Sequence, residues 1–138
     1  MVSLKGAVYF SATDPLHGPG LWRTDGTNAG TAFVADPAPG TLYDTGPLWL
    51  TPFGGELFFT ARDRKGTRQL WRSDGTREGT VSVTDESIFS HPAFSGMRDV
   101  GPTNLVVVGR TLFFTRTEIG NARLWALRRA AIVPSPSR

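Results

Sequence analysis

An internal repeat of 49 residues constrains this chain more than any other feature of its sequence. Residues 6–34 and 55–83 align without a gap, and 13 of these 29 positions are identical. A third copy begins at Gly109 and follows the same pattern as far as Trp125, after which the expected Arg-Ser-Asp-Gly-Thr is replaced by Ala-Leu-Arg-Arg-Ala. A repeated unit of this length predicts a fold built from stacked copies of one supersecondary structure.

Each copy is predicted to contain short antiparallel strands. Leu57–Ala61 has strand-forming residues and the length of a strand that is buried on both faces, while Gln69–Ser73 alternates apolar and polar side chains. Asp74-Gly75 suits a tight turn, and a further strand is expected near Val81–Val83. With the hairpin turn at Gly54-Gly55, this gives about four strands per repeat.

Four antiparallel strands that repeat every 40 to 50 residues or so are typical of a β-propeller blade. The predicted fold class is therefore all-β, with antiparallel four-stranded repeats of about 49 residues as the blades of an incomplete propeller. A β-solenoid is the alternative, although its coils are usually much shorter and lack hairpin turns at these positions. The chain supplies under three blades, whereas closed propellers have about 4 to 8.

The repeat divides the chain into four parts. We expect a partial first blade over 1–34, a second repeat over 35–83, a third and degenerate repeat over 84–127, and a disordered, basic, non-repeat tail over 128–138. Because Leu4 aligns with Phe53, the chain is expected to begin beside a hairpin turn with no partner strand ahead of it. The loss of the signature after Trp125 leads us to expect a fragment of a longer gene whose last residues are read out of frame.

Composition excludes several classes of protein. Residues 1–122 hold eleven Lys and Arg against twelve acids, so the net charge of +3 comes from four arginines near the C-terminus. A nucleic-acid groove needs positive charge over a folded face, and no nucleic-acid partner is expected. No apolar run is long enough to span a membrane, and the N-terminal residues lack the apolar region of a signal peptide. The absence of cysteine excludes disulfides, cysteine zinc ligands and a cysteine nucleophile.

The Asp-Gly-Thr segments are predicted to be structural turns. The aspartate carboxylate can accept hydrogen bonds from backbone amides within the turn, and the glycine permits a positive φ. Calcium binding is the alternative role, but one acid per copy is poor provision for an ion that takes about 6 to 8 oxygen ligands. No cofactor or metal site is therefore expected. The turn residues are Asp25, Gly26 and Thr27 in the first copy and Asp74, Gly75 and Thr76 in the second.

Two other sets of residues repeat. The aromatic set is expected to fill the core between blades, with carbohydrate stacking by the tryptophans as the alternative. The acidic set starts equivalent loops and is expected to gather on one rim, either as loop caps or as a ring that faces a cation or a sugar. The aromatic set is Phe10, Trp22, Phe59, Trp71, Phe114 and Trp125, and the acidic set is Asp14, Asp63 and Glu118.

No catalytic arrangement is evident in the sequence. His17 and His91 fall at non-equivalent positions of the repeat, and both are expected to be surface loop residues. Ser90 precedes His91, but nothing positions an acid behind this histidine as a catalytic triad requires. Arg23 and Arg72 follow the tryptophans, so they are expected on the opposite strand face, where they pair with a neighbouring blade or are solvated.

The repeated signature resembles that of a known family. Leu21–Thr31 reads Leu-Trp-Arg-Thr-Asp-Gly-Thr-Asn-Ala-Gly-Thr, and Leu70–Thr80 reads Leu-Trp-Arg-Ser-Asp-Gly-Thr-Arg-Glu-Gly-Thr. Both are similar to the ELWxxDGT repeat of large bacterial, notably myxobacterial, proteins that are often labelled hyalin-repeat proteins. Leu50–Phe59 resembles the strand pair that precedes the signature in that family. The leading Glu is Gly20 in one copy and Gln69 in the other, which indicates that its side chain is not essential to the fold.

The resemblance covers about residues 4–127 and implies a propeller-like, extracellular or cell-surface repeat protein rather than an enzyme. The expected function is a non-catalytic module that binds protein or polysaccharide, with further propeller blades or self-association as partners of its sheets. The alternative is the remnant of a propeller hydrolase or lyase whose active centre lies in missing blades. A unique cluster of acids or histidines in one copy would favour that alternative.

Overall fold

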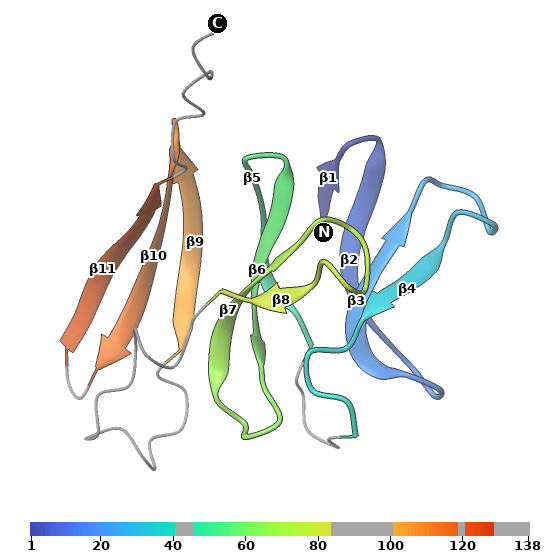
Figure 1. Ribbon diagram of the computed structural model, residues 1–138, viewed down its shortest axis with the longest axis horizontal. Helices are drawn as coiled ribbons and strands as arrows, with labels where there is room; N and C mark the ends of the chain where they lie inside the picture. Colours follow the sequence, from blue (N-terminus) through green and yellow to red (C-terminus); the bar gives the residue numbers. More distant parts are fainter. Residues whose placement is uncertain (41–45, 84–100, 119–120, 129–138) are drawn as a thin grey trace, which may run out of the picture.

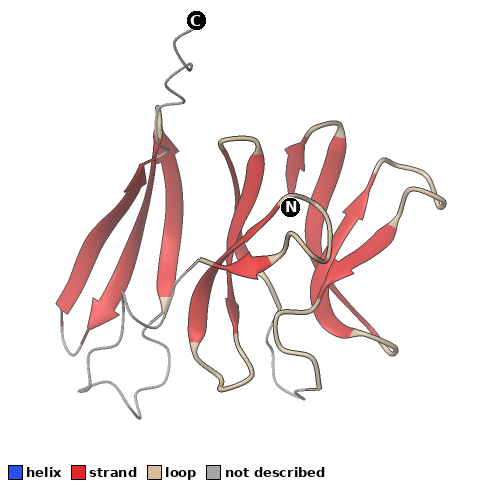
Figure 2. Ribbon diagram, in the orientation of Figure 1, coloured by secondary structure: helices blue, strands red, loops and turns tan. Residues whose placement is uncertain are grey.

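The structure is a computed structural model that describes residues 1–40, 46–83, 101–118 and 121–128, and these residues form an all-β fold without a helix (Figure 2). Their strands form three antiparallel sheets. The first sheet contains β1 (Val2–Leu4), β2 (Ala7–Asp14), β3 (Gly18–Thr24) and β4 (Ala32–Ala35). The second contains β5 (Leu48–Phe53), β6 (Glu56–Arg62), β7 (Arg68–Ser73) and β8 (Val81–Ser82). The third contains β9 (Pro102–Val108), β10 (Thr111–Glu118) and β11 (Asn121–Arg128).

The three sheets stand side by side in chain order (Figure 1). Within each sheet every strand pairs with the strand next to it in the sequence. The first strands of the sheets also contact one another, β1 with β5 and β5 with β9. The second sheet therefore has a neighbour on both of its faces.

The strands expected in the second repeat are confirmed. The five central residues of β6 are all buried, as expected of a strand covered on both faces. Gly54 and Gly55 join β5 to β6 with φ values of 64° and 82°, which glycine adopts at little cost. Val81 and Ser82 form the short strand β8, which pairs with β7.

The expectation that the chain begins without a partner strand is wrong. Val2–Leu4 forms β1 and pairs with β2 in the register Leu4↔Ala7. Lys5 and Gly6 make the turn between them, with φ values of 50° and 77°. Because a two-residue turn reverses the chain directly, three residues ahead of it are enough to build a fourth strand, and the first sheet is as complete as the second.

The third sheet extends further along the chain than the repeat pattern does. β11 continues three residues beyond Trp125, and Arg128 is paired with Thr111 of β10. Pairing with β10 uses backbone groups, so it does not require the side chains of the signature. The start of the third repeat, at residues 84–100, and the tail at 129–138 lie outside the described residues. No helix in the described part is long and apolar enough to cross a membrane.

Two apolar cores hold the sheets together. The first core lies between the first and second sheets, and the second core lies between the second and third sheets. Buried residues of the first core are Tyr9, Leu21, Val34, Ala35, Leu57, Phe59 and Ala61. Buried residues of the second are Phe53, Phe58, Leu70, Leu105, Leu112 and Phe114. The successive residues Phe58 and Phe59 thus belong to different cores, as the alternation of a strand requires.

Truncation of Leu57 tests how far the fold depends on the first core. Leu57 is fully buried, so Leu57→Ala is expected to lower the free energy of unfolding by about 2–5 kcal/mol through lost burial and a residual cavity. Leu16→Ala is the matched control, because Leu16 is 84% exposed in a loop, and it is expected to change stability by less than about 0.5 kcal/mol. Urea denaturation followed by tryptophan fluorescence measures both. Equal effects from the two variants would contradict this assignment of the core.

Candidate functional site

The signature turn of the first repeat is closed by its own side chains. Asp25 Oδ1 accepts hydrogen bonds from the backbone N–H of Thr27 at 2.9 Å and from the Thr27 hydroxyl at 2.7 Å. The Gly30 N–H donates to Thr27 Oγ1 at 2.9 Å, and the Thr31 hydroxyl donates to the Thr27 carbonyl oxygen at 2.7 Å. Thr24 Oγ1 lies 2.7 Å from Thr31 Oγ1 and ties the two ends of the turn together.

The second repeat contains the same network with nearly the same distances. Asp74 Oδ1 accepts from the N–H and the hydroxyl of Thr76 at 2.9 and 2.7 Å. The Gly79 N–H donates to Thr76 Oγ1 at 2.9 Å. Ser73 Oγ lies 2.7 Å from Thr80 Oγ1, which reproduces the bond across the ends of the turn. These carboxylate oxygens are thus directed into the turn.

The two glycines of each turn meet different constraints. Gly26 and Gly75 adopt φ values of 96° and 99°, a region that residues with a side chain rarely enter. Gly30 and Gly79 are required by close approach instead, because a Cβ at either position would collide with the aspartate carboxylate of the same turn. The signature spacing therefore places the aspartate carboxylate against a glycine, which has no side chain to displace it.

A methyl group at Gly79 is expected to disrupt the turn. Gly79→Ala would push the Asp74 carboxylate away from Thr76, and we expect a loss of about 1–3 kcal/mol in the free energy of unfolding, in the range of overpacked sites. Chemical denaturation measures this loss. Glu78→Ala is the control, since Glu78 is exposed in the same turn; if both variants were equally stable, the close packing would have no energetic role.

Hydrogen bonding holds the pKa values of the Asp25 and Asp74 carboxyls below the ordinary value of 3.8. The hydroxyl of Thr27 or Thr76 is the main cause, and the backbone N–H of the same threonine adds to it. Hydrogen bonds accepted by a carboxylate favour its charged form. The folded turns therefore bind a proton less readily than the unfolded chain does.

This lowered pKa predicts a contribution to stability that depends on pH. The contribution of Asp74 is present above the ordinary pKa of 3.8 and is lost as the pH falls through the lower folded-state value. We expect Asp74→Asn to lower the melting temperature at pH 7 by a few degrees, and to lower it less at pH 3. Thermal unfolding at both pH values, with Glu78→Gln as the control, measures the difference. The same change at both pH values would contradict a role for the charge.

Asp14 of the acidic set caps its own loop. Figure 1 shows β2, β6 and β10 ending at the same side of the three sheets, and the acidic set lies at these strand ends. Asp14 Oδ1 accepts the backbone N–H groups of Leu16 and His17 at 2.8 and 2.6 Å. Its Oδ2 lies 2.8 Å from His17 Nδ1, and this side-chain contact is the main cause that lowers the Asp14 pKa.

Asp63 is placed in the same way in the second repeat. Its Oδ1 accepts the N–H groups of Lys65 and Thr67, each at 2.9 Å, and its Oδ2 accepts a longer bond of 3.5 Å from Gln69 Nε2. Glu118 is the last residue of β10, and its side chain lies outside the described part. Among the side chains that the structure describes, no three from His, Asp or Glu gather where they would hold a metal ion.

The buried members of the aromatic set lie where sheets meet. Phe59 belongs to the first core and Phe114 to the second, and they are 0% and 4% exposed. Trp71 and Trp125 are half-buried and pack against the same two cores. The indole N–H of Trp71 donates to the Ala61 carbonyl at 3.3 Å, which fixes this ring against its own sheet.

Phe10 and Trp22 lie on the other face of the first sheet. Their strand neighbours Tyr9 and Leu21 point into the first core, so the alternation of the strands turns Phe10 and Trp22 away from the second sheet. Both rings are only half-buried, and the described residues place no sheet against them. They differ in this from Phe59 and Trp71, which occupy the same positions of the repeat.

His17 joins this aromatic face. Its ring stacks on Phe33 with centroids 4.2 Å apart and planes 14° apart, and Trp22 meets Phe33 edge-on at 5.6 Å. His17 is an exposed loop residue as expected, but Asp14 and Phe33 fix it on two sides. No sequence pattern indicates this contact, because Phe33 reaches His17 only through the pairing of β4 with β3.

Arg72 forms its ion pair within its own sheet and not with a neighbouring sheet, which was one of the two environments expected for it. It pairs with Glu56 at 2.8 Å within the second sheet, on a face where both side chains are partly exposed. Glu56 lies in β6 and Arg72 lies in the adjacent strand β7. Arg72 is paired with Phe58, two residues along β6 from Glu56, so Glu56 and Arg72 are on the same face. Cross-strand neighbours on one face are within reach of long side chains, and an exposed pair of this kind adds little stability. Arg23 is exposed.

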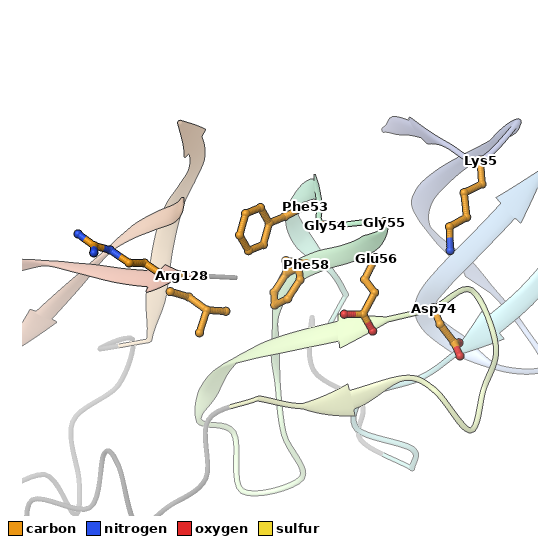
Figure 3. A pocket seen from close by; sticks show the side chains of 9 residues that line it. Lys5, Phe53, Gly54, Gly55, Glu56, Phe58, Asp74 and Arg128 are labelled. Carbon is orange, nitrogen blue, oxygen red and sulfur yellow. The ribbon is translucent and has the colours of Figure 1, made fainter. Parts of the chain in front are cut away.

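A hollow lies at the opposite end of the sheets, next to several charged groups. Its cavity volume is about 690 Å³, within the usual size of a ligand site. Figure 3 shows the rings of Phe53 and Phe58 between Arg128 on one side and Glu56 on the other. The full lining is Lys5, Phe53, Gly54, Gly55, Glu56, Phe58, Asp74, Leu127 and Arg128.

This hollow was not predicted from the sequence. Its lining comes from a turn of the first sheet, a hairpin and a signature turn of the second, and the last strand of the third. Apolar rings form the middle, and charges of both signs stand around them. Glu56 is oriented by Arg72, and Asp74 by Thr76. The arrangement can therefore present the Glu56 carboxylate, held by Arg72, and the cations of Lys5 and Arg128 to one ligand.

Comparison with protein-family models, with curated proteins and with solved structures finds no match to this chain. The geometry of its sheets, turns and hollow is thus the basis for a functional proposal.

Proposed function

We propose that the chain is a non-catalytic module of the β-propeller type, part of a surface or secreted repeat protein, and that it binds protein or polysaccharide. In this proposal the three sheets are blades. Support comes from the two four-stranded meanders and the three-stranded one, from their stacking in chain order and from the contacts between their first strands. The resemblance of Leu21–Thr31 and Leu70–Thr80 to the ELWxxDGT repeat supports the same interpretation.

The observation that carries the non-catalytic proposal is that the described acids of the repeat accept hydrogen bonds within their own turns and loops. Asp25 and Asp74 accept hydrogen bonds inside their turns, and Asp14 and Asp63 accept backbone bonds inside their loops. General acid–base chemistry needs a carboxyl aimed at a substrate with a pKa near the working pH. The lowered pKa values of Asp14, Asp25 and Asp74 are shifted away from that range. The alternative function is that of a remnant of a propeller hydrolase or lyase.

The hollow is the site that we assign to the ligand. Phe53 and Phe58 line the hollow but are buried in the second core, at 7% and 5% exposed, so a ligand would mainly meet the charged side chains around them. Glu56 and Arg128 stand on opposite sides of these rings, where they can accept from and donate to hydroxyl groups. An oligosaccharide offers hydroxyl groups to both of these side chains, so polysaccharide is the ligand class that we test first.

Titration with oligosaccharides tests this function. We expect at least one neutral or acidic oligosaccharide to bind the folded chain with a Kd of about 10 µM to 1 mM, the affinity of a small open site. Glu56→Gln and Arg128→Gln are each expected to weaken binding about 5- to 10-fold through the loss of one charged hydrogen bond. Arg64→Gln, an exposed change in the β6–β7 loop, is the control and is expected to leave the Kd unchanged. Isothermal titration calorimetry measures all four proteins.

The products of the same incubations separate binding from catalysis. Unchanged oligosaccharide after prolonged incubation is expected from a binding module. New reducing ends or unsaturated sugars would overturn the non-catalytic proposal. If Glu56→Gln and Arg128→Gln bound the oligosaccharide with the same affinity as the control, the ligand would bind outside the hollow.

A further inference from the structure

One leucine position occurs in all three repeats, and its exposure differs sharply between them. Leu21 and Leu70 are 0% and 2% exposed, whereas Leu124 is 69% exposed. Leu21 lies in the core between the first and second sheets, and Leu70 lies in the core between the second and third. Leu124 occupies the corresponding face of the third sheet, where the described residues place no further sheet.

Other apolar residues surround Leu124 on this face of the third sheet. Val106 and Val108 are 54% and 62% exposed. Val106 pairs with Phe113, so these two side chains share one face of adjacent strands. The opposite face of β10 carries Leu112 and Phe114, which are buried in the second core. We name Val106, Val108, Phe113 and Leu124 the outward face of the third sheet.

The first sheet has a half-buried apolar face on its side away from the second sheet, where the His17 ring stacks on Phe33. Phe10 pairs with Trp22, and Trp22 pairs with Phe33, which places the three rings on one face. Val8 lies on that face as well, since it is two residues from Phe10 in β2. We name Val8, Phe10, Trp22 and Phe33 the outward face of the first sheet.

These two outward faces match, in the positions of their residues, the two halves of an interface that the chain forms twice, between the first and second sheets and between the second and third. At the first core, Leu57 and Phe59 of the second sheet pack against Leu21 of the first. At the second core, Leu112 and Phe114 of the third sheet pack against Leu70 of the second.

The outward faces carry the matching residues of each half. Val8 and Phe10 hold the positions of Leu57 and Phe59, and Leu124 holds the position of Leu21 and Leu70. The outward face of the third sheet is therefore shaped to pack on the outward face of a first sheet.

We propose that a second copy of this chain packs here, with the outward face of its third sheet on the outward face of the first sheet. The contact joins different patches on the two copies, so it is heterologous and must either close into a ring or continue as a filament. Two copies with two such contacts give a closed ring of six sheets, within the range of about 4 to 8 at which propellers close. The proposal rests on the sheet stacking described under the proposed function, but it does not depend on the ligand.

Sedimentation velocity of the 138-residue chain tests the proposal. At about 100 µM, where a dimer with a Kd of about 1 µM is almost fully formed, we expect twice the chain mass of 15.0 kDa. Leu124→Asp buries an unpaired carboxylate in the contact and is expected to weaken the dimer at least about 100-fold. Because Leu124 is exposed in the single chain, this variant keeps its fold, which circular dichroism checks. Val81→Asp on the edge strand β8 is the matched control and is expected to remain dimeric.

Cross-linking tests the head-to-tail arrangement. The chain has no cysteine, so Val8→Cys and Leu124→Cys each introduce a single thiol on one outward face. A short thiol cross-linker is expected to join the chains in a mixture of the two variants and in neither variant alone. Cross-links in Leu124→Cys alone would show two like faces in contact and would overturn the proposal.

A monomer at about 100 µM, or an open series of larger assemblies, would also overturn the closed dimer. Oligosaccharide titration of the same samples keeps this result separate from the proposed function. A monomeric chain that still binds its ligand would refute the dimer alone, and a dimer that binds no oligosaccharide would refute the ligand alone.

Discussion

Burial of one sheet face against the next is the interaction on which the rest of this structure depends. Hydrogen bonds complete each antiparallel meander, but they do not cover the apolar side chains that alternate across its strands. The central strand β6 is buried throughout because its sheet has a neighbour on each side. The first and third sheets have one neighbour each among the described residues, and the exposure of Leu124 is the direct result.

The signature turns stand apart from this stacking, because their hydrogen bonds run within a few residues of sequence. Thr24 to Thr31 in one copy and Ser73 to Thr80 in the other form the same bonds. A turn that satisfies its own polar groups can occur at the exposed end of any sheet without a partner from another repeat. This independence explains why the signature keeps its residues while the surrounding loops differ.

Much of this arrangement could be predicted from the sequence, because local pattern determines it. The apolar run in β6, the glycines of the β5–β6 hairpin and the turn geometry at Asp74-Gly75 all follow from residue type and spacing. The contacts that escaped prediction depend on register between strands. The stack of His17 on Phe33 and the pair of Arg72 with Glu56 join residues whose proximity only the paired strands create. The hollow combines three sheets and has no signature of its own.

The order of strand pairing has a consequence for how the chain reaches this structure. Because each strand pairs with the next strand of its own sheet, the backbone contacts within a sheet close only short loops. Folding rates rise as contacts become more local, since less chain entropy is lost before the first stabilising contacts form. We therefore expect each meander to act as its own folding unit, able to begin anywhere along the chain, and the docking of preformed sheets to be the slower, cooperative step.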